Sequence, residues 1–241
     1  MKAMIFAAGL GTRLVPFTQT MPKAMVPVAG KPMIQWTIEK LIQSGFDEII
    51  INVHHFAGQI IEFVRKKNSF GIRIEFSDET DALLETGGGL LKASWFFDDN
   101  QPFLVHNVDV VSDIDTAEMF GHHAENNAIA TLAVSRRKTS RYFLFDTSLR
   151  LRGWKNINTG EEKIPYPVKE ALLPMAFGGI HVISPEIFPL ITEKGRFSIN
   201  DVYLRLSGHY PIRAYQHDTE AWFDMGKPAD LAAAGRYLEQ L

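Results

Sequence analysis

The first half of the chain alternates short β-rich runs with helical patterns, and this alternation is the feature that most limits the possible folds. Strands are expected at residues 3–8, 48–53 and 72–77, and helices at residues 33–44 and 59–67. A strand, a crossover helix and a second strand in succession form a βαβ unit, which builds a parallel sheet with helices on its faces. The pattern therefore predicts an α/β fold.

The second half has a different pattern, in which strands are separated by polar loops. Strands are expected at residues 128–135, 142–145 and 175–183, and a helix is expected at residues 229–240. No internal repeat, low-complexity tract or linker marks a boundary between domains. We therefore expect one Rossmann-like three-layer domain over residues 1–241, with a mixed, mostly parallel central sheet.

The composition excludes several classes of protein. Hydrophobic residues make up 46% and charged residues 22% of the chain, which are the proportions of a globular protein. A formal net charge of -3 gives no long-range attraction to nucleic acid or to an acidic membrane surface. No apolar run reaches the roughly 20 residues that a membrane-spanning helix needs. With no cysteine, a metal site would need oxygen or histidine ligands. We expect a cytoplasmic protein with no nucleic-acid or membrane partner.

A glycine-rich loop directly follows the first expected strand, and a Pro-Lys pair comes shortly after it. The residues of interest are Ala8, Gly9, Gly11, Thr12, Arg13 and Lys23. Glycines at such a place let backbone N–H groups approach phosphate oxygens, and Arg13 and Lys23 add positive charge. An ordinary exposed turn is the alternative, but the order of strand, glycine loop, arginine and Pro-Lys favours a phosphate site. The loop matches neither the Walker A nor the Rossmann pattern.

These segments resemble the fingerprint of the sugar nucleotidyltransferases, a G-x-G-T-R-L loop followed by P-K-x-x-x-P-[VL]. The resemblance covers essentially the whole chain and implies a glycosyltransferase-A-like fold. It implies a nucleotide-binding half at about residues 1–110 and a sugar-phosphate-binding half at about residues 111–241. It further implies that Arg13 and Lys23 are the catalytic contacts to phosphate oxygens, in a reaction catalysed by positioning and electrostatics.

A second glycine-rich segment resembles the family's glycine turn against the nucleotide base and sugar. The resemblance assigns Glu85, Gly87 and Gly88 to nucleotide binding. A glycine turn with a purely structural role is the alternative. A helix is expected after this turn, at residues 92–97.

Two aspartates lie in segments that resemble the family's metal-binding elements. Asp109 ends Asn107-Val108-Asp109, after a strand expected at residues 102–106, and Asp224 lies in a W-x-D-[IM]-G-x-P segment. The resemblance implies that both aspartates hold Mg²⁺, which prefers one or two carboxylates with phosphate oxygens and water. It also implies that Asn107 contacts the sugar phosphate. Val108 replaces the family's usual glycine, so the turn is expected to differ locally.

Two weaker resemblances concern the acceptor. Lys155 lies where many relatives have the lysine of an E-K-P segment, although the glutamate and proline are missing here, and a solvated lysine is the alternative. Gly179 resembles the glycine of the family's x-x-G-I strand, where a sugar ring can lie on the backbone, and a β-bulge is the alternative. The basic residues 136–138 are expected to form a solvated surface.

The resemblance implies a Mg²⁺-dependent transfer of a nucleotidyl group from a nucleoside triphosphate to a sugar 1-phosphate, with release of pyrophosphate. It favours UTP as donor and N-acetylmuramate 1-phosphate or a related amino sugar as acceptor, a reaction of cell-wall nucleotide-sugar biosynthesis. The alternatives are guanylyl transfer to mannose 1-phosphate, cytidylyl transfer to phosphocholine, and a non-catalytic nucleotide-binding regulatory module. A homo-oligomer is compatible with the sequence.

Overall fold

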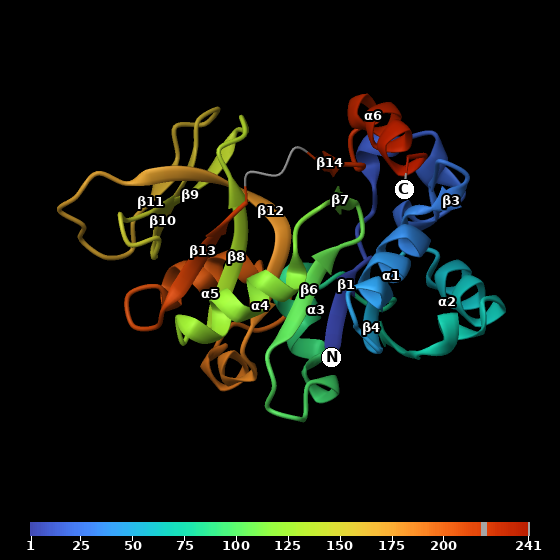
Figure 1. The fold of residues 1–241 in the computed structure, drawn as a ribbon, viewed down its shortest axis with the longest axis horizontal. Coiled ribbons are helices and arrows are strands. Elements are labelled where there is room, and N and C mark those ends of the chain that lie inside the picture. The colour runs from blue at the N-terminus through green and yellow to red at the C-terminus, as the bar shows by residue number, and fades with distance from the viewer. Residues whose placement is uncertain (218–220, 241) are drawn as a thin grey trace.

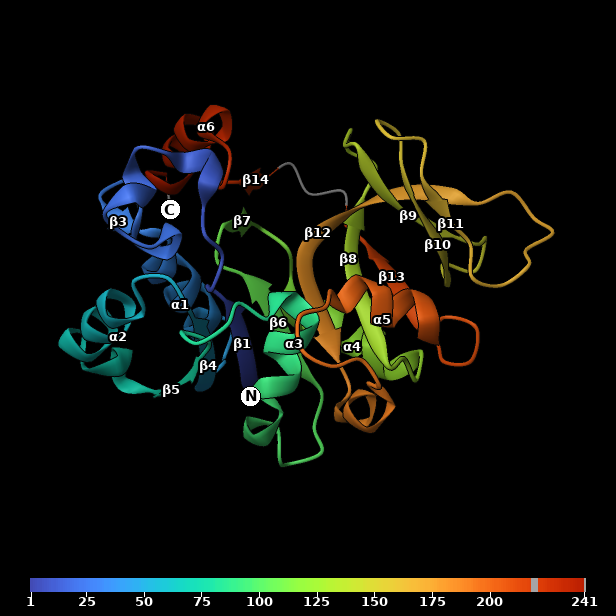
Figure 2. The same ribbon diagram turned by 180° about the vertical axis from the view of Figure 1, so that it is seen from behind.

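The structure is a computed structural model that describes residues 1–217 and 221–240. A ten-stranded mixed sheet forms its centre, and helices cover both faces (Figures 1 and 2). The strands are β1 (Lys2–Phe6), β2 (Pro27–Val28), β3 (Lys31–Pro32), β4 (Glu48–Val53), β5 (Arg73–Asp78), β6 (Phe103–Asn107), β7 (Val110–Ser112), β8 (Ala130–Ser135), β9 (Arg141–Phe145), β10 (Leu151–Asn156), β11 (Glu162–Lys163), β12 (Leu173–Ile183), β13 (Ile212–Gln216) and β14 (Trp222–Asp224). The α-helices are α1 (Met33–Gln43), α2 (Ala57–Lys66), α3 (Glu85–Lys92), α4 (Thr116–Glu125), α5 (Ile199–Leu206) and α6 (Pro228–Leu238). The predicted three-layer α/β fold is confirmed.

The main sheet has the strand order β11-β10-β9-β12-β6-β1-β4-β5. Its first-half strands β5, β4, β1 and β6 are all parallel, as the βαβ pattern predicts. Strand β12 then joins β6 in the antiparallel direction and also pairs with β8 and β9. Because β12 contacts both halves, it connects the parallel part of the sheet to the antiparallel hairpins.

Alternating side chains of the parallel strands supply two separate hydrophobic cores. In β1, Ile5 faces the core under α1, α2, α4 and α6, whereas Met4 faces the core under α3 and α5. Strand β4 repeats the alternation, with Ile51 on the first face and Ile50 on the second. Successive side chains of a strand point to opposite faces, so a fully apolar strand fits a sheet that is covered on both sides.

The second glycine-rich segment forms a helix, which corrects the expectation of a glycine turn and of a helix at residues 92–97. Helix α3 begins at Glu85, and all three glycines lie inside it. Glycine is a poor helix former, but these positions leave no room for a side chain. A Cβ atom at Gly87 would lie 2.4 Å from the Phe197 ring, and one at Gly88 would lie 2.4 Å from the carbonyl oxygen of Gly195. Close packing against the segment before α5 therefore overrides helix propensity.

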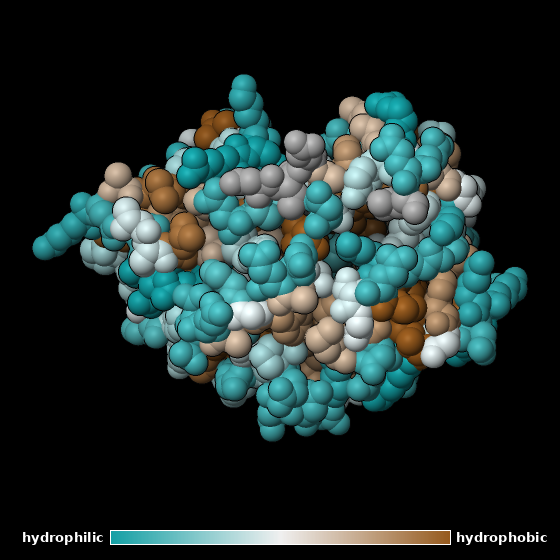
Figure 3. Space-filling view, in the orientation of Figure 1, coloured by the Kyte–Doolittle hydropathy of each residue, from teal (hydrophilic) through white to brown (hydrophobic). Residues whose placement is uncertain are grey.

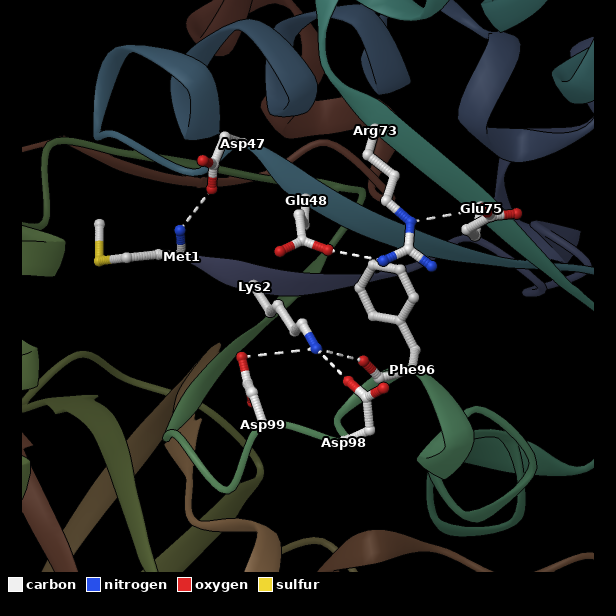
Figure 4. A network of polar contacts seen from close by, with 9 residues as sticks. All are labelled: Met1, Lys2, Asp47, Glu48, Arg73, Glu75, Phe96, Asp98 and Asp99. Carbon is white, nitrogen blue, oxygen red and sulfur yellow. Dashed lines mark hydrogen bonds and ion pairs between the residues drawn. The ribbon is translucent and has the colours of Figure 1, made fainter.

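An ionic network anchors the amino-terminal end of β1 (Figure 4). The buried Lys2 Nζ donates to Phe96 O at 2.8 Å and pairs with Asp98 Oδ1 at 2.5 Å and Asp99 Oδ2 at 3.4 Å. The Arg73 guanidinium lies 5.0 Å from the centre of the Phe96 ring. These contacts fix the end of the sheet that lies away from the glycine loop.

None of the helices in the described ranges is both long and apolar enough to span a membrane.

The face of the molecule in Figure 3 is mostly hydrophilic, and its hydrophobic side chains lie in scattered patches.

The buried histidines predict how stability depends on pH. Burial lowers the pKa of His106 and His123 to about 4 and that of His181 to about 3. The unfolded chain then binds more protons than the native chain, so this stability is present above about pH 6.5 and is lost as the pH falls towards 4. We expect roughly 1–2 kcal/mol of unfolding free energy to be lost per buried histidine between pH 7.5 and 5.

Urea unfolding at a series of pH values measures this loss. His123→Gln should reduce the slope between pH 7 and 5, whereas His55→Gln, at an exposed position, should leave it unchanged. An equal slope in wild type and His123→Gln would contradict the assignment.

Candidate functional site

A cavity of about 450 Å³ opens where the central parallel strands end. It collects residues from the loop after β1, from the end of β6, from β12 and from the starts of α3 and α5. Its lining residues are Phe6, Ala8, Gly9, Lys23, Asn52, Glu79, Leu83, Glu85, Thr86, Asn107, Asp109, Phe177, His181, Ser198, Ile199 and Asn200. Ligands of α/β proteins bind at the carboxyl ends of the strands, so this cavity is the candidate site.

The glycine loop turns at Gly11, where no other residue fits well. Gly11 has φ +66°, and a Cβ atom there would lie 2.7 Å from Thr18 Cγ2 and 2.9 Å from Lys23 Cβ. Thr12 and Arg13 then lie in the short 3₁₀ helix Thr12–Leu14. The close approach at Gly11 holds the Lys23 segment against the loop, so the two sequence fragments of the predicted phosphate site form one unit.

Two buried polar side chains, Asn52 and Glu79, support the glycine loop. The sequence analysis missed this pair. Asn52 Oδ1 accepts hydrogen bonds from Ala7 N at 2.7 Å and Ala8 N at 3.4 Å, and Asn52 Nδ2 donates to Glu79 Oε1 at 2.7 Å. Glu79 is fully buried, and its second oxygen accepts from Leu84 N at 3.1 Å. The sequence signal that could have revealed this pair is Asn52, the polar residue in the otherwise apolar run of residues 49–53.

The structure brings Asp109 and Asp224 together by pairing two short strands. Strands β7 and β14 are antiparallel, with Asp224 opposite Val110, and Met225 N donates to Asp109 O at 2.7 Å. Gly226 N donates to Asp224 Oδ1 at 3.0 Å, which orients that carboxylate. Two aspartates that are remote in the sequence are therefore held on paired segments, and Asp109 lines the cavity.

Among the described residues, three cations form ion pairs with the two carboxylates, and a fourth interacts with the charge of Asp224. Lys23 forms an ion pair with Asp109, and Arg13 Nη1 and Lys227 Nζ lie 3.5 Å and 3.3 Å from Asp224 Oδ2. Burial raises the pKa of Asp224, but the charges of Arg13 and Lys227 outweigh burial and hold that pKa below its usual value. The fourth cation, Arg137, is half-buried beside the ring of Trp222. Asp224 is therefore ionised at neutral pH.

Gly226 is the point where these charged groups converge. A Cβ atom there would lie 2.6 Å from Asp109 Oδ2 and 2.8 Å from Lys23 Nζ. It would also lie 2.9 Å from Arg13 Nη2. The missing side chain of Gly226 thus gives the room in which a carboxylate and two cations meet.

Val108 occupies its place without strain. It is buried, its N–H donates to Phe6 O at 3.2 Å, and its φ is not positive. The turn after β6 therefore accepts a β-branched residue, and Asn107 and Asp109 both face the cavity. Replacing the usual glycine leaves these two predicted site residues in place.

The start of α3 forms one wall of the cavity. Glu85 and Thr86 line it, and the Glu85 carboxylate pairs with Arg196 at 2.7 Å. Thr86 Oγ1 accepts a hydrogen bond from Ile199 N at 3.0 Å, which ties α3 to α5. Gly87 and Gly88 are buried in this helix contact and are not among the residues that line the cavity.

Gly179 and Lys155, which weaker resemblances assign to binding of the acceptor substrate, lie in different parts of the structure. Gly179 has φ +78° at a register shift between β12 and β8, and a Cβ atom there would lie 2.8 Å from Asn107 Nδ2. Gly179 is thus a bulge residue that makes room for Asn107. Lys155 lies on β10 opposite Tyr142 and is not among the residues that line the cavity.

The expectation that residues 136–138 form a solvated surface holds for Arg136 and Lys138, which are exposed, but is corrected for Arg137. Arg137 is half-buried, its Nη2 donates to Phe177 O at 2.6 Å, and its guanidinium lies 3.8 Å from the centre of the Trp222 ring. Trp222 Nε1 donates to Gly178 O at 2.9 Å. Arg137 is therefore not solvated surface but part of the contact that holds β14 against β12.

The chain is similar to known proteins over its whole length. The family model "Nucleotidyl transferase" matches residues 2–240. The N-acetylmuramate alpha-1-phosphate uridylyltransferase of Neisseria meningitidis serogroup B is 45% identical, over 97% of this chain and 96% of that protein. A UTP–glucose-1-phosphate uridylyltransferase of Synechocystis is 35% identical over 98% of this chain, and a mannose-1-phosphate guanyltransferase of Yarrowia lipolytica is 32% identical over 100%. The chain spans 63% and 65% of the length of these last two proteins.

Solved structures share the fold at lower identity. A putative glucose-1-phosphate thymidylyltransferase from Bacillus anthracis has a TM-score of 0.81 at 19% identity, over 100% of this chain and 96% of its own. The UDP-glucose pyrophosphorylase from Acinetobacter baumannii has a TM-score of 0.77 at 19% identity, over 99% of this chain and 97% of its own.

The convergence at Gly226 predicts that Gly226→Ala disrupts the site while the fold persists. The added methyl group must displace Asp109, Lys23 or Arg13, and displacing reacting groups by about 1 Å can cost on the order of 10²-fold in rate. The turnover number should fall on the order of 10²-fold, and the melting temperature should stay nearly unchanged. Gly235→Ala, in α6 with Val28 Cγ1 3.9 Å away, is the matched control and should stabilise the protein by roughly 0.5–1 kcal/mol without changing turnover. Equal turnover in the two variants would contradict the geometry.

Proposed function

Because the chain belongs to the nucleotidyl transferase family, we propose that it transfers a nucleotidyl group from a nucleoside triphosphate to a sugar 1-phosphate and releases pyrophosphate. One observation carries the proposal: β7 and β14 place Asp109 and Asp224 beside the cations of the glycine loop. We also infer one catalytic domain, since a single sheet runs through both halves of the chain.

The order of strands supports a position for each substrate. Strand β6, which ends at Asn107 just before Asp109, lies between β1 and β12. The triphosphate belongs on the β1 side, beside Arg13 and Lys23, where a glycine loop and two cations can bind phosphate oxygens. The acceptor belongs on the β12 side, so that the two phosphates meet in front of Asp109.

The residues present fit a magnesium ion. Among the described residues, no group of three or more histidine, aspartate or glutamate side chains could hold a metal ion. Asp109 and Asp224, whose backbones are held together by the pairing of β7 and β14, would be the two protein ligands. Mg²⁺ typically takes one or two carboxylates and completes its shell with phosphate oxygens and water. Lys23 and Arg13 are paired with these carboxylates. When bound, the ion would neutralise phosphate charge.

The chain's own groups bind, orient and stabilise charge. An oxygen of the acceptor phosphate attacks the α-phosphorus of the nucleotide in line, and the bond to the pyrophosphate oxygen breaks. Before this attack, on binding of the triphosphate, Arg13 and Lys23 leave their carboxylates and contact phosphate oxygens, where they stabilise the negative charge that develops on the leaving pyrophosphate. The attack needs no protein nucleophile, because the acceptor phosphate is itself the nucleophile.

We infer UTP as donor and N-acetylmuramate 1-phosphate, or a related amino sugar 1-phosphate, as acceptor. Support comes from the Neisseria relative, which is 45% identical and matches this chain over almost its full length. Guanylyl transfer to mannose 1-phosphate is the second candidate, favoured by the 32% identity to the Yarrowia guanyltransferase across the whole chain.

Both carboxylates are predicted to be essential. Asp109→Asn or Asp224→Asn removes one negative charge from the proposed Mg²⁺ site and should lower kcat on the order of 10²-fold or more. The double variant should be little worse than either single one, because both residues hold the same ion. Asp113→Asn, an exposed aspartate next to β7, is the control. Near-wild-type turnover in either site variant would remove that residue from the metal site.

Substrate preference is tested by pyrophosphate release with UTP, GTP, CTP, ATP and dTTP, each with saturating sugar 1-phosphate. We expect the highest kcat/KM with UTP and N-acetylmuramate 1-phosphate, and no pyrophosphate when the sugar phosphate is omitted. A preference for GTP with mannose 1-phosphate would replace the uridylyl assignment. Pyrophosphate release without any acceptor would indicate a hydrolase and contradict the transferase proposal.

A further inference from the structure

A buried histidine forms part of the acceptor side of the cavity, and neither the sequence motifs nor the proposed mechanism uses it. His181 lies on β12, is 1% exposed and lines the cavity together with Phe177. Its ring lies between two aromatic side chains, with ring centres 6.2 Å from Phe6 and 5.4 Å from Phe177. Packing therefore fixes the plane of the imidazole.

The inner nitrogen of this ring has a single partner. His181 Nδ1 lies 2.6 Å from the hydroxyl oxygen of Tyr203, which projects from α5 and is completely buried. Among the described residues, the Tyr203 hydroxyl forms no other hydrogen bond, and no group pairs with His181 Nε2. The outer nitrogen of a buried imidazole is thus left for whatever occupies the cavity.

The need to satisfy the Tyr203 hydroxyl decides the tautomer. If Nδ1 carried the proton, the hydroxyl hydrogen would be buried without an acceptor, which costs free energy. If the hydroxyl instead donates to Nδ1, both buried groups are satisfied, and the proton of the neutral ring is on Nε2. Burial lowers the pKa of His181 to about 3, so the ring stays neutral in the physiological range.

We propose that Tyr203 holds His181 in its Nε2–H form, so that Nε2 donates a hydrogen bond to an uncharged oxygen of the acceptor sugar, a hydroxyl or an amide carbonyl. The location follows from the strand order, since β12 lies on the far side of β6 from the glycine loop. A neutral donor adds no charge near the phosphates, so it distinguishes sugars by their oxygen substituents. This inference rests on the proposed function, because it assumes that the acceptor binds on the β12 side.

Kinetics with the best sugar 1-phosphate of the substrate panel test the contact. His181→Phe should raise the acceptor KM roughly tenfold or more and leave the KM for the nucleoside triphosphate within about twofold. His181→Gln, whose amide can still donate, should retain most of the acceptor affinity. The control is His123→Gln, because His123 is equally buried but both its ring nitrogens are bonded, to Thr131 and Ser184. An unchanged acceptor KM in His181→Phe, or an equal rise in both KM values, would overturn the proposal.

Nitrogen-15 NMR of the imidazole rings tests the tautomer without any turnover. The His181 signals, assigned by their loss in His181→Gln, should show a neutral ring protonated at Nε2. In Tyr203→Phe, protonation should shift to a mixture of the two nitrogens. A wild-type ring protonated at Nδ1 would overturn the proposal even if the enzyme is active. Failure of wild type to turn over any sugar phosphate would instead reject the proposed function.

Discussion

The pairing of β14 with β7 is the contact on which the rest of the site depends. Each of the two strands has only three residues. Their pairing nevertheless joins the segment that follows β6 to a segment more than a hundred residues later in the sequence. The hydrogen bond from Met225 N to Asp109 O fixes the two aspartates relative to each other. Arg137 and Trp222 hold β14 on its other side, against the β12 backbone at Phe177 and Gly178. The candidate site thus forms where the two halves of the sheet meet.

The charges of the candidate site are balanced. Two carboxylates at one point would repel each other, but Lys23, Arg13 and Lys227 compensate their charge. Under the proposed function the same cations would bind the phosphate oxygens of the triphosphate, and the carboxylates would then hold the metal ion. The Arg13 side chain is 55% exposed, so its ion pair with Asp224 is individually weak. The site can therefore be ordered before the substrates bind.

The parallel half of the fold follows from local sequence patterns, and the rest depends on contacts that are remote in sequence. Apolar runs predicted β1 and β4 because a strand covered on both faces is apolar throughout. Helix α3 could not be predicted from Gly87–Gly89. Glycine is required there because Phe197 and Gly195 pack too closely to leave room for side chains, and this contact is remote in sequence. Strand β13 and helix α5 were also missed. Their burial depends on partners in β8 and β10, which no local pattern reveals.

The residues of the candidate site also divide into those that sequence motifs predict and those that depend on contacts remote in sequence. Motif resemblance selected Arg13, Lys23, Asp109 and Asp224, and the structure places all four around Gly226 or its neighbours. Asn52, Glu79 and His181 were missed, because each acts through a buried hydrogen bond to a residue elsewhere in the chain.

The most direct test of this account is the binding of Mn²⁺, a paramagnetic substitute for Mg²⁺, measured by electron paramagnetic resonance with nucleotide present. The account predicts one site per chain in the wild type, strongly weakened in Asp109→Asn and equally in Asp224→Asn. Tight Mn²⁺ binding that persists when either aspartate is replaced would show that the two carboxylates do not share an ion, and would contradict the central claim.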